Sequence, residues 1–116
     1  MNDTLSLDQA FIRKLTQIVL DNLQNENFGV NDLAREAGMS RSVIHHRLRV
    51  IKRQNISQFI REIRLKRAME LLQQQAGAAS DITFKVGFGS PSYFNKCFHE
   101  YYGCTPGEAK KRILPE

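Results

Sequence analysis

Apolar residues recur at helical spacing along most of the chain, and no segment alternates between apolar and polar residues as a half-buried strand would. The first stripe consists of Phe11, Ile12, Leu15, Ile18, Val19 and Leu23. A second, on a longer segment, consists of Phe59, Ile60, Ile63, Ala68, Met69 and Leu72. The pattern predicts an all-α fold with about seven helices, organised as two helix-turn-helix subdomains joined by a long linker helix.

Capping residues and glycines divide this pattern into elements. Asn31, Ser40, Asn55 and Ser80 are expected N-caps, and Pro91 suits a first helical turn. The predicted helices cover residues 11–23, 32–37, 41–52, 56–74, 81–86, 91–102 and 106–112. We expect one domain over residues 9–112, made of a first lobe (9–54), a linker helix (55–75) and a second lobe (76–112).

Two parts of the chain are faint copies of each other. The paired positions are Asp32 and Asp81, Leu33 and Ile82, Ala37 and Val86, Gly38 and Gly87, Ser40 and Ser90, Ile44 and Phe94, and Leu48 and Phe98. The offset is 49 before the glycine turn and 50 after it. Each copy reads as a short helix, a glycine turn and a second helix, which is the pattern of a helix-turn-helix. Two copies in a small basic chain indicate DNA binding.

Positive charge is concentrated in the middle of the chain. The chain has 116 residues and a net charge of +5. Residues 1–40 have a net charge of −3, whereas residues 41–67 hold nine Lys or Arg against Glu62 alone, a net of +8. Residues 68–116 hold five of each sign. Such a field suits a surface that displaces counterions from phosphates, although a solvated basic helix without a partner is the alternative.

The second helix of each copy has one apolar face and one donor-rich face when drawn at about 100° per residue. The expected buried stripes are Ile44, Leu48 and Ile51 in the first helix, and Phe94, Phe98 and Tyr101, with Cys97 beside them, in the second. The opposite faces carry Ser42, His45, His46 and Arg49 in the first helix, and Ser92, Asn95, Lys96 and His99 in the second. None of these eight residues is acidic, as a surface lying between two phosphate strands requires.

These eight residues are candidates for contacts with DNA bases. Asn pairs bidentately with adenine, Lys and Arg pair with guanine, and His and Ser donate to base acceptors. The alternative for any one of them is simple solvation.

Phosphate contacts are expected from helix N-termini and flanking basic residues. The candidates are Ser40, Arg41, Lys52, Arg53, Arg67 and Ser90. Arg61 and Arg64 also lie on the long helix. They are equally explained by pairing with Glu62 or Glu70, or by a role in stabilising the interface of the lobes.

Three segments together resemble the DNA-binding domain of the AraC/XylS family of bacterial transcription regulators. The main one is I-T-F-K-V-G-F-G-S-P-S-Y-F-N-K-C-F-H-E-Y-Y-G-C-T-P-G-E, residues 82–108. The others are G-M-S-R-S-V-I-H-H-R-L, residues 38–48, and F-I-R-E-I-R-L-K-R-A-M-E-L-L, residues 59–72. The resemblance covers about residues 9–112. It implies that two reading helices enter successive major grooves on one side of a DNA duplex, about one helical turn apart.

The resemblance also has implications for the whole protein. The sequence of these segments is most similar to the family's domains that follow receiver domains or belong to hybrid two-component sensors. We therefore expect the chain to be the C-terminal effector domain of a larger regulator, with a receiver or sensor domain in the parent chain and RNA polymerase as a further partner. A bacterial cytoplasmic location, at the nucleoid, follows from the same resemblance.

The chain departs from the family pattern at four places. Arg53 replaces the glycine usual between the first reading helix and the linker helix, so Gln54 or Asn55 is expected to take the left-handed backbone conformation. Thr83 replaces a common Ala, and Ala79 replaces a branched apolar residue. Ala109-Lys110 replaces an aromatic-Arg pair. We expect these changes to thin the packing of the second lobe.

Other functional classes have weak support. Cys97, His99, Cys104 and the pair His45-His46 lack the spacing of a metal site or a catalytic group, so we expect no enzyme activity, no metal and no cofactor. Two cysteines fit a reducing compartment. The chain begins without a signal-peptide pattern and has no membrane-length apolar run, so we expect no membrane contact. A protein-interaction module that docks transcription machinery without reading a sequence is the remaining alternative.

The two copies are expected to contribute differently. Most basic residues surround the first copy, while the second is nearly neutral. We expect the first lobe and the linker helix to supply most of the phosphate affinity, and the second lobe to be the more adjustable reader.

Overall fold

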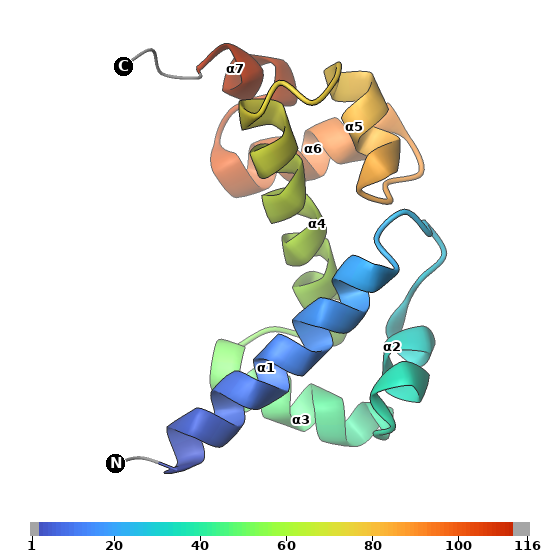
Figure 1. Ribbon diagram of the computed structural model, residues 1–116, viewed down its shortest axis with the longest axis vertical. Coiled ribbons are helices and arrows are strands. Elements are labelled where there is room, and N and C mark those ends of the chain that lie inside the picture. Colours follow the sequence, from blue (N-terminus) through green and yellow to red (C-terminus); the bar gives the residue numbers. More distant parts are fainter. Residues whose placement is uncertain (1–2, 113–116) are drawn as a thin grey trace. The chain divides into compact units, whose positions relative to one another are not determined.

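The computed structural model describes residues 3–112, which are all-α as predicted. Its seven helices are α1 (Asp3–Asp21), α2 (Val30–Ala37), α3 (Arg41–Lys52), α4 (Ile56–Gln73), α5 (Ala79–Lys85), α6 (Pro91–Tyr102) and α7 (Pro106–Lys111) (Figure 1). The described residues contain no strand. The first helix begins eight residues earlier than its apolar stripe suggested, because its first two turns are exposed and carry no core positions.

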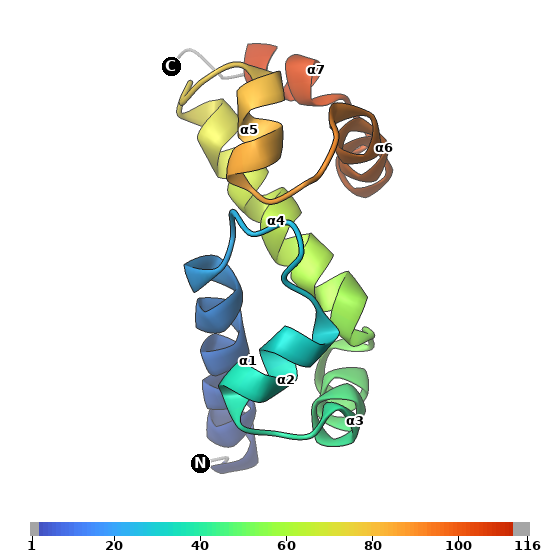
Figure 2. The same cartoon turned by 90° about the vertical axis from the view of Figure 1, so that its right-hand side faces the viewer.

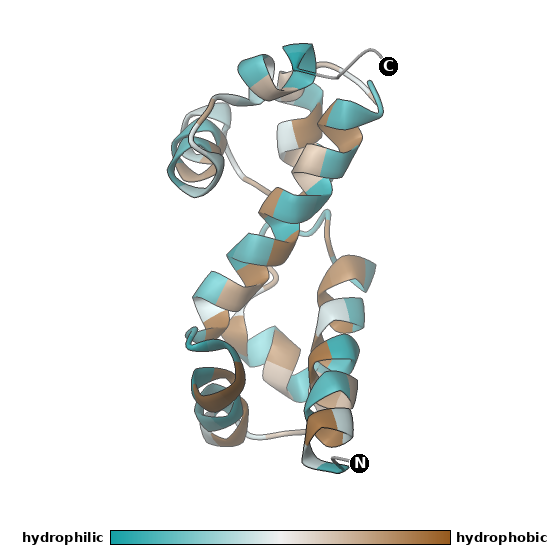
Figure 3. Ribbon diagram, turned by 90° about the vertical axis from the view of Figure 1, so that its left-hand side faces the viewer, coloured by the Kyte–Doolittle hydropathy of each residue, from teal (hydrophilic) through white to brown (hydrophobic). Residues whose placement is uncertain are grey.

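The helices form two compact units, each with its own core. The first unit holds described residues 3–22 and 28–63, and the second holds residues 23–27 and 64–112. Helix α4 supplies Ile56, Phe59, Ile60 and Ile63 to the first core, and Leu65, Ala68 and Leu72 to the second. Polar residues lie between these apolar ones along α4, as its mixed colouring shows (Figure 3). Residues 23–27 connect α1 with α2, yet they belong to the second unit.

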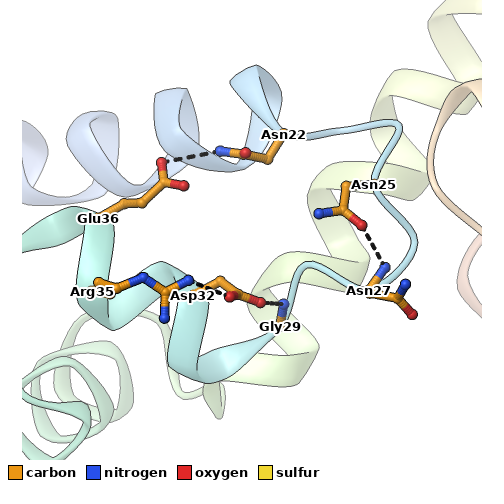
Figure 4. A network of polar contacts seen from close by, with 7 residues as sticks. All are labelled: Asn22, Asn25, Asn27, Gly29, Asp32, Arg35 and Glu36. Carbon is orange, nitrogen blue, oxygen red and sulfur yellow. Dashed lines mark hydrogen bonds and ion pairs between the residues drawn. The ribbon is translucent and has the colours of Figure 1, made fainter.

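The first helix-turn-helix consists of α2 and α3. Helix α2 begins after Gly29, not after Asn31 as predicted, because the Asp32 carboxylate accepts the backbone N–H of Gly29 at 2.9 Å and fixes that helix end (Figure 4). Asn31 instead lies within the first turn. Gly38 ends α2 in the left-handed conformation with φ of 69°, which a glycine adopts without steric cost. Ser40 caps α3 as predicted, its hydroxyl accepting the N–H of Val43.

Helix α3 ends at an arginine in the left-handed conformation. Arg53 itself has φ of 58° and ψ of 36°, and its N–H donates to the Arg49 carbonyl. The expectation that Gln54 or Asn55 would take this role was wrong. Asn55 is used otherwise, because its side chain accepts the N–H of Gln58 at 2.8 Å and caps α4, as predicted.

Replacing Arg53 with glycine is therefore expected to stabilise the first unit. A non-glycine residue in the left-handed region carries a cost of about 1–2 kcal/mol, part of which a glycine regains as extra freedom of the unfolded chain. We expect Arg53→Gly to raise the free energy of unfolding by about 1 kcal/mol. Urea denaturation followed by circular dichroism measures this. Arg49→Gly, in the interior of the same helix, is the control and should destabilise the protein instead.

The second helix-turn-helix consists of α5 and α6. Helix α5 begins after Ala78 without a side-chain cap, so Ser80 is not the cap that was predicted. Helix α6 begins after Ser90, whose hydroxyl accepts the N–H of Tyr93, with Pro91 in its first turn. Gly103 ends α6 in the left-handed conformation. Thr105 then caps α7, its hydroxyl accepting the N–H of Glu108.

The apolar face of α6 differs at one position from the helical wheel. Phe94, Cys97 and Phe98 are buried, but Tyr101 is 43% exposed. Tyr102 takes the expected place and packs on Phe98, with ring centroids 4.8 Å apart. Tyr102 follows Phe98 by four residues and therefore lies on the same side of the helix. Tyr101 and Tyr102 both lie near the apolar face at the last turn, and packing determines which of them is buried.

The substitutions in the second unit are accommodated by specific contacts. Thr83 is fully buried, and its hydroxyl donates to the Ala79 carbonyl at 3.1 Å. Lys110 Nζ donates to the Gly77 carbonyl at 2.9 Å, while Ala109 is buried in the second core. Thr83 and Ala79 together thus form one local contact, and Lys110 holds the connector before α5. The thinner packing of the second lobe stays a prediction.

Candidate nucleic-acid interface

The outward faces of α3 and α6 are exposed, each within its own unit. All eight candidates for base contacts are exposed: Ser42, His45, His46, Arg49, Ser92, Asn95, Lys96 and His99. In each unit the second helix follows a short first helix and a turn, as seen for α2 and α3 and for α5 and α6 (Figure 2). The structure therefore leaves both predicted faces open to a ligand.

Four further exposed residues flank these faces and were not predicted. Val43 and Val50 lie beside the polar face of α3, and Val50 is 65% exposed. The positions fifty residues later are Tyr93 and Glu100 on α6, both exposed. Exposed valines suit apolar contact with thymine methyl groups. Glu100 places an acidic group at the edge of the second face, so that face is less favourable to phosphate than the first.

The helix starts are partly engaged in capping. The Ser40 and Ser90 hydroxyls each accept a backbone N–H at 3.2 Å. Arg41 is exposed and donates to the Asn31 side chain at 3.0 Å. A hydroxyl that accepts a capping bond can still donate its own hydrogen to a phosphate oxygen. These three residues remain positioned for phosphate contacts.

Two other phosphate candidates are paired with acidic residues. Lys52 Nζ lies 3.7 Å from Glu62 Oε1, and Arg67 Nη1 lies 2.7 Å from Glu70 Oε1. Both basic side chains are only partly exposed. Arg53 is exposed and forms no ion pair with another described residue. A phosphate would have to compete for Lys52 and Arg67, whereas Arg53 is available.

Some basic residues in the middle of the chain are engaged by contacts within the protein. The Arg47 guanidinium lies 3.9 Å from the centre of the Phe11 ring, in a cation–π contact. Arg64 is 5% exposed and donates to three backbone carbonyls. The partners observed for Arg64 are thus backbone carbonyls of the second unit. Arg41, Arg49, Arg53 and Arg61 are at least partly exposed and lie outside the ion pairs named above.

An open groove of about 420 Å³ adjoins the first face within the first unit. Its lining residues are Val30, Arg41, Ser42, His45, Asn55, Ile56 and Ser57. The groove thus brings a cation and two candidate base-contact residues next to the start of α4. Backbone N–H groups at a helix start favour anions.

Three ionisable groups have shifted pKa values, and each has a structural cause. The pKa of Asp32 is lowered by the N–H of Gly29 and by Arg35, and the pKa of Glu108 is lowered by the N–H of Thr105. Both carboxylates accept backbone hydrogen bonds at helix starts. Burial lowers the pKa of Arg64, but an arginine remains protonated in proteins. None of these groups has the environment of a catalytic acid or base.

The described residues lack a metal-binding cluster and a membrane-spanning helix. Among residues 3–112, no three His, Cys, Asp or Glu side chains gather as a metal ion would need. Cys97 and Cys104 are both buried as free thiols in the second core. In the same part of the chain, no helix is both long and apolar enough to cross a membrane.

The fold and these faces define an all-α protein with two helix-turn-helix units, each presenting an exposed donor-rich second helix. A family model described as a helix-turn-helix domain matches residues 33–112. "Histidine kinase P4" of Formosa agariphila is 38% identical over 107 residues, which is 92% of this chain and 8% of that protein. The chain spans 8–43% of the length of the curated relatives it matches.

Solved structures share the fold. A DNA-binding transcriptional dual regulator from Escherichia coli K-12 has a TM-score of 0.76 and 28% identity, with 85% of this chain and 87% of that chain covered. The C-terminal domain of AraT, a response regulator from Geobacillus stearothermophilus, has a TM-score of 0.78 and 19% identity, with 90% and 88% covered.

The chain belongs to the AraC-type helix-turn-helix family. It is a sequence-specific DNA-binding domain of the kind that transcription regulators carry.

Proposed function

We propose that the domain binds duplex DNA with α3 and α6 in successive major grooves, reading two half-sites about one helical turn apart. One observation carries this proposal: both second helices expose a polar face free of acidic residues at equivalent positions, fifty residues apart. Because the two half-sites are read by different helices, a single chain can bind an asymmetric site.

The proposed base contacts are divided between the two helices. Ser42, His45, His46 and Arg49 read one half-site from α3, and Ser92, Asn95, Lys96 and His99 read the other from α6. The proposed phosphate contacts are Ser40, Arg41, Lys52, Arg53, Arg67 and Ser90. Arg41 and Arg53 are expected to contribute most, because Lys52 and Arg67 are paired with Glu62 and Glu70.

A selection of bound fragments from random duplex DNA tests the two-groove arrangement. The expected result is an enriched site with two conserved segments whose centres are about 10 base pairs apart. Enrichment of a single short segment would contradict the proposal that both helices read bases. A control selection with the double variant Ser92→Ala, Asn95→Ala should retain one segment and lose the other.

Single substitutions then separate base contacts from phosphate contacts. Asn95→Ala is expected to relax preference at one position of the site, because each good base contact discriminates by about 1–3 kcal/mol. His46→Ala should act likewise in the other half-site. Arg41→Ala should weaken binding to all sequences alike and reduce the salt slope by about 1. Competition binding with single-base variants measures these effects, and an altered base preference in Arg41→Ala would show that the two groups were sorted wrongly.

The parent protein is proposed to be a larger bacterial regulator in which this domain is the effector. The chain covers a small part of the histidine kinase that it matches, so most of that relative lies in other domains. We propose that a receiver or sensor domain of a two-component system controls the domain. RNA polymerase is the proposed protein partner, and the bacterial cytoplasm, at the nucleoid, is the proposed location.

A further inference from the structure

We propose that Arg64 is a positioning residue for the second reading helix. Its side chain holds the turn of the second helix-turn-helix against the segment 23–27. The proposal rests on the proposed function of α6, to which it adds a residue that touches no DNA. All groups involved lie within the second unit.

The Arg64 guanidinium is almost fully enclosed by backbone acceptors. Nη1 donates to the Leu23 carbonyl at 2.5 Å and to the Val86 carbonyl at 2.7 Å, and Nη2 donates to the Asn25 carbonyl at 3.1 Å. Two of these carbonyls belong to a segment without helical hydrogen bonds, and buried carbonyls need partners. One planar cation therefore satisfies three backbone groups that come from two distant parts of the chain.

The third carbonyl belongs to the end of α5. Val86 is the residue that ends α5, so its carbonyl lies at the negative end of the helix. A cation at this point is favourable, and its bond determines where the chain leaves α5. The next residues form the turn that leads to Ser90 and α6. The position of the Val86 carbonyl thus affects the direction in which α6 begins.

Gly87 provides the space that the guanidinium occupies. It has φ of 88°, and a Cβ added there would lie 1.4 Å from Arg64 Nη1 and 2.2 Å from the Leu23 carbonyl oxygen. A side chain at residue 87 would therefore overlap the guanidinium and the carbonyl together. The glycine of this turn is required by the arginine as well as by its backbone conformation.

The segment 23–27 is ordered on its other side too. The Asn25 side chain accepts the N–H of Asn27 at 2.9 Å, which closes a turn at the Asn25 carbonyl (Figure 4). Leu23 packs against the second core, and a Cβ at Gly89 would lie 2.4 Å from the Glu26 carboxylate. The segment therefore contacts the turn between α5 and α6 at both of its glycines, and Arg64 joins the two.

Arg64→Lys tests the proposal because it retains the charge. An ammonium group presents its donors from one nitrogen and cannot span three carbonyls as a guanidinium does. Arg35→Lys is the matched control, since Arg35 forms only an exposed pair with Asp32. The assay measures the loss of affinity caused by single-base changes in each half-site. The half-sites are assigned with His46→Ala and Asn95→Ala.

In the wild type, each base change is expected to weaken binding between about fivefold and 150-fold. In Arg64→Lys, these penalties should shrink by about threefold or more in the half-site read by α6, and stay unchanged in the half-site read by α3. Arg35→Lys should match the wild type in both. If base changes in the half-site of α6 do not weaken binding by the wild-type protein, the proposed function is wrong, and this result does not concern the role of Arg64.

Three results would overturn the role of Arg64. Unchanged penalties in both half-sites would show that α6 is aimed without it. Loss of helical structure in the second unit of Arg64→Lys, seen by amide hydrogen exchange, would show that Arg64 only stabilises the fold. A uniform loss of affinity with unchanged penalties would also contradict positioning, since it indicates a general effect on binding.

Discussion

Raising the salt concentration from about 50 to 200 mM is expected to weaken duplex DNA binding by about three orders of magnitude or more. The reason is that each phosphate neutralised by a basic side chain releases condensed counterions, and added salt opposes this release. A loss of this size corresponds to about six or more phosphate contacts. The helix starts and exposed arginines of the domain are numerous enough to make six phosphate contacts.

The structure sharpens this expectation. Among the basic residues between positions 41 and 67, Arg47, Lys52, Arg64 and Arg67 contact an aromatic ring, a carboxylate or backbone carbonyls within the chain. The salt slope should therefore be smaller than the net charge of this segment suggests. Replacing Glu62 with Gln would release Lys52, so Glu62→Gln is expected to steepen the slope by up to about 1.

Fluorescence anisotropy with a labelled duplex, at five or more salt concentrations, measures the slope. A duplex of unrelated sequence serves as the control and should show a similar slope with lower affinity, since non-specific binding is mostly electrostatic. Binding that is insensitive to salt, or absent on duplex DNA, would support the alternative of a module that docks proteins without reading DNA.

Phe94→Ala is expected to lower the free energy of unfolding of the second unit by about 3–5 kcal/mol. Phe94 is fully buried and lies among aromatic rings, with centroids 5.1 Å from Phe88 and 5.6 Å from Phe98. Its removal leaves a cavity and ends two aromatic contacts. Because the first unit has a separate core, its stability should change little.

The chain contains probes that separate the two units. Its three tyrosines, Tyr93, Tyr101 and Tyr102, are all in the second unit, and it has no tryptophan. Tyrosine fluorescence during urea denaturation therefore reports on the second unit, whereas circular dichroism reports on both. Phe84→Ala is the matched control, since Phe84 is 53% exposed on α5 and its loss should cost less than about 1 kcal/mol. Similar costs for the two variants would contradict the observed core.

Helix positions could be predicted where local signals agree. Ser40 and Asn55 cap helices as predicted, because a capping side chain bonds to a backbone N–H only three residues away. The prediction failed where two caps compete within one turn. Gly29 and Asn31 are both possible N-caps of α2. The helix begins after Gly29 because the Asp32 side chain accepts the N–H of Gly29.

The candidate site was predictable to the extent that a helix face is periodic. The eight exposed residues of α3 and α6 follow from their spacing relative to Ile44, Leu48, Phe94 and Phe98, which are buried. The exposure of Val50 was not predicted, because the pattern of apolar and polar residues does not indicate that a single apolar residue is exposed. The burial of Tyr102 in place of Tyr101 was not predicted, because a helical wheel does not show which of the two tyrosines at the last turn has a packing partner.

The helices, the duplication and the two donor-rich faces can be predicted from the sequence, since they depend on spacings of three to seven residues and on local caps. The role of each basic residue, in contrast, depends on how the chain packs. Arg64 and Arg49 look alike in sequence, yet one is buried against three carbonyls and the other is exposed. The acceptors for Arg64 lie 22, 39 and 41 residues away in the sequence. Patterns that span a few residues cannot predict contacts at such separations. The same is true of residues 23–27, whose membership in the second unit results from packing and not from their place in the chain.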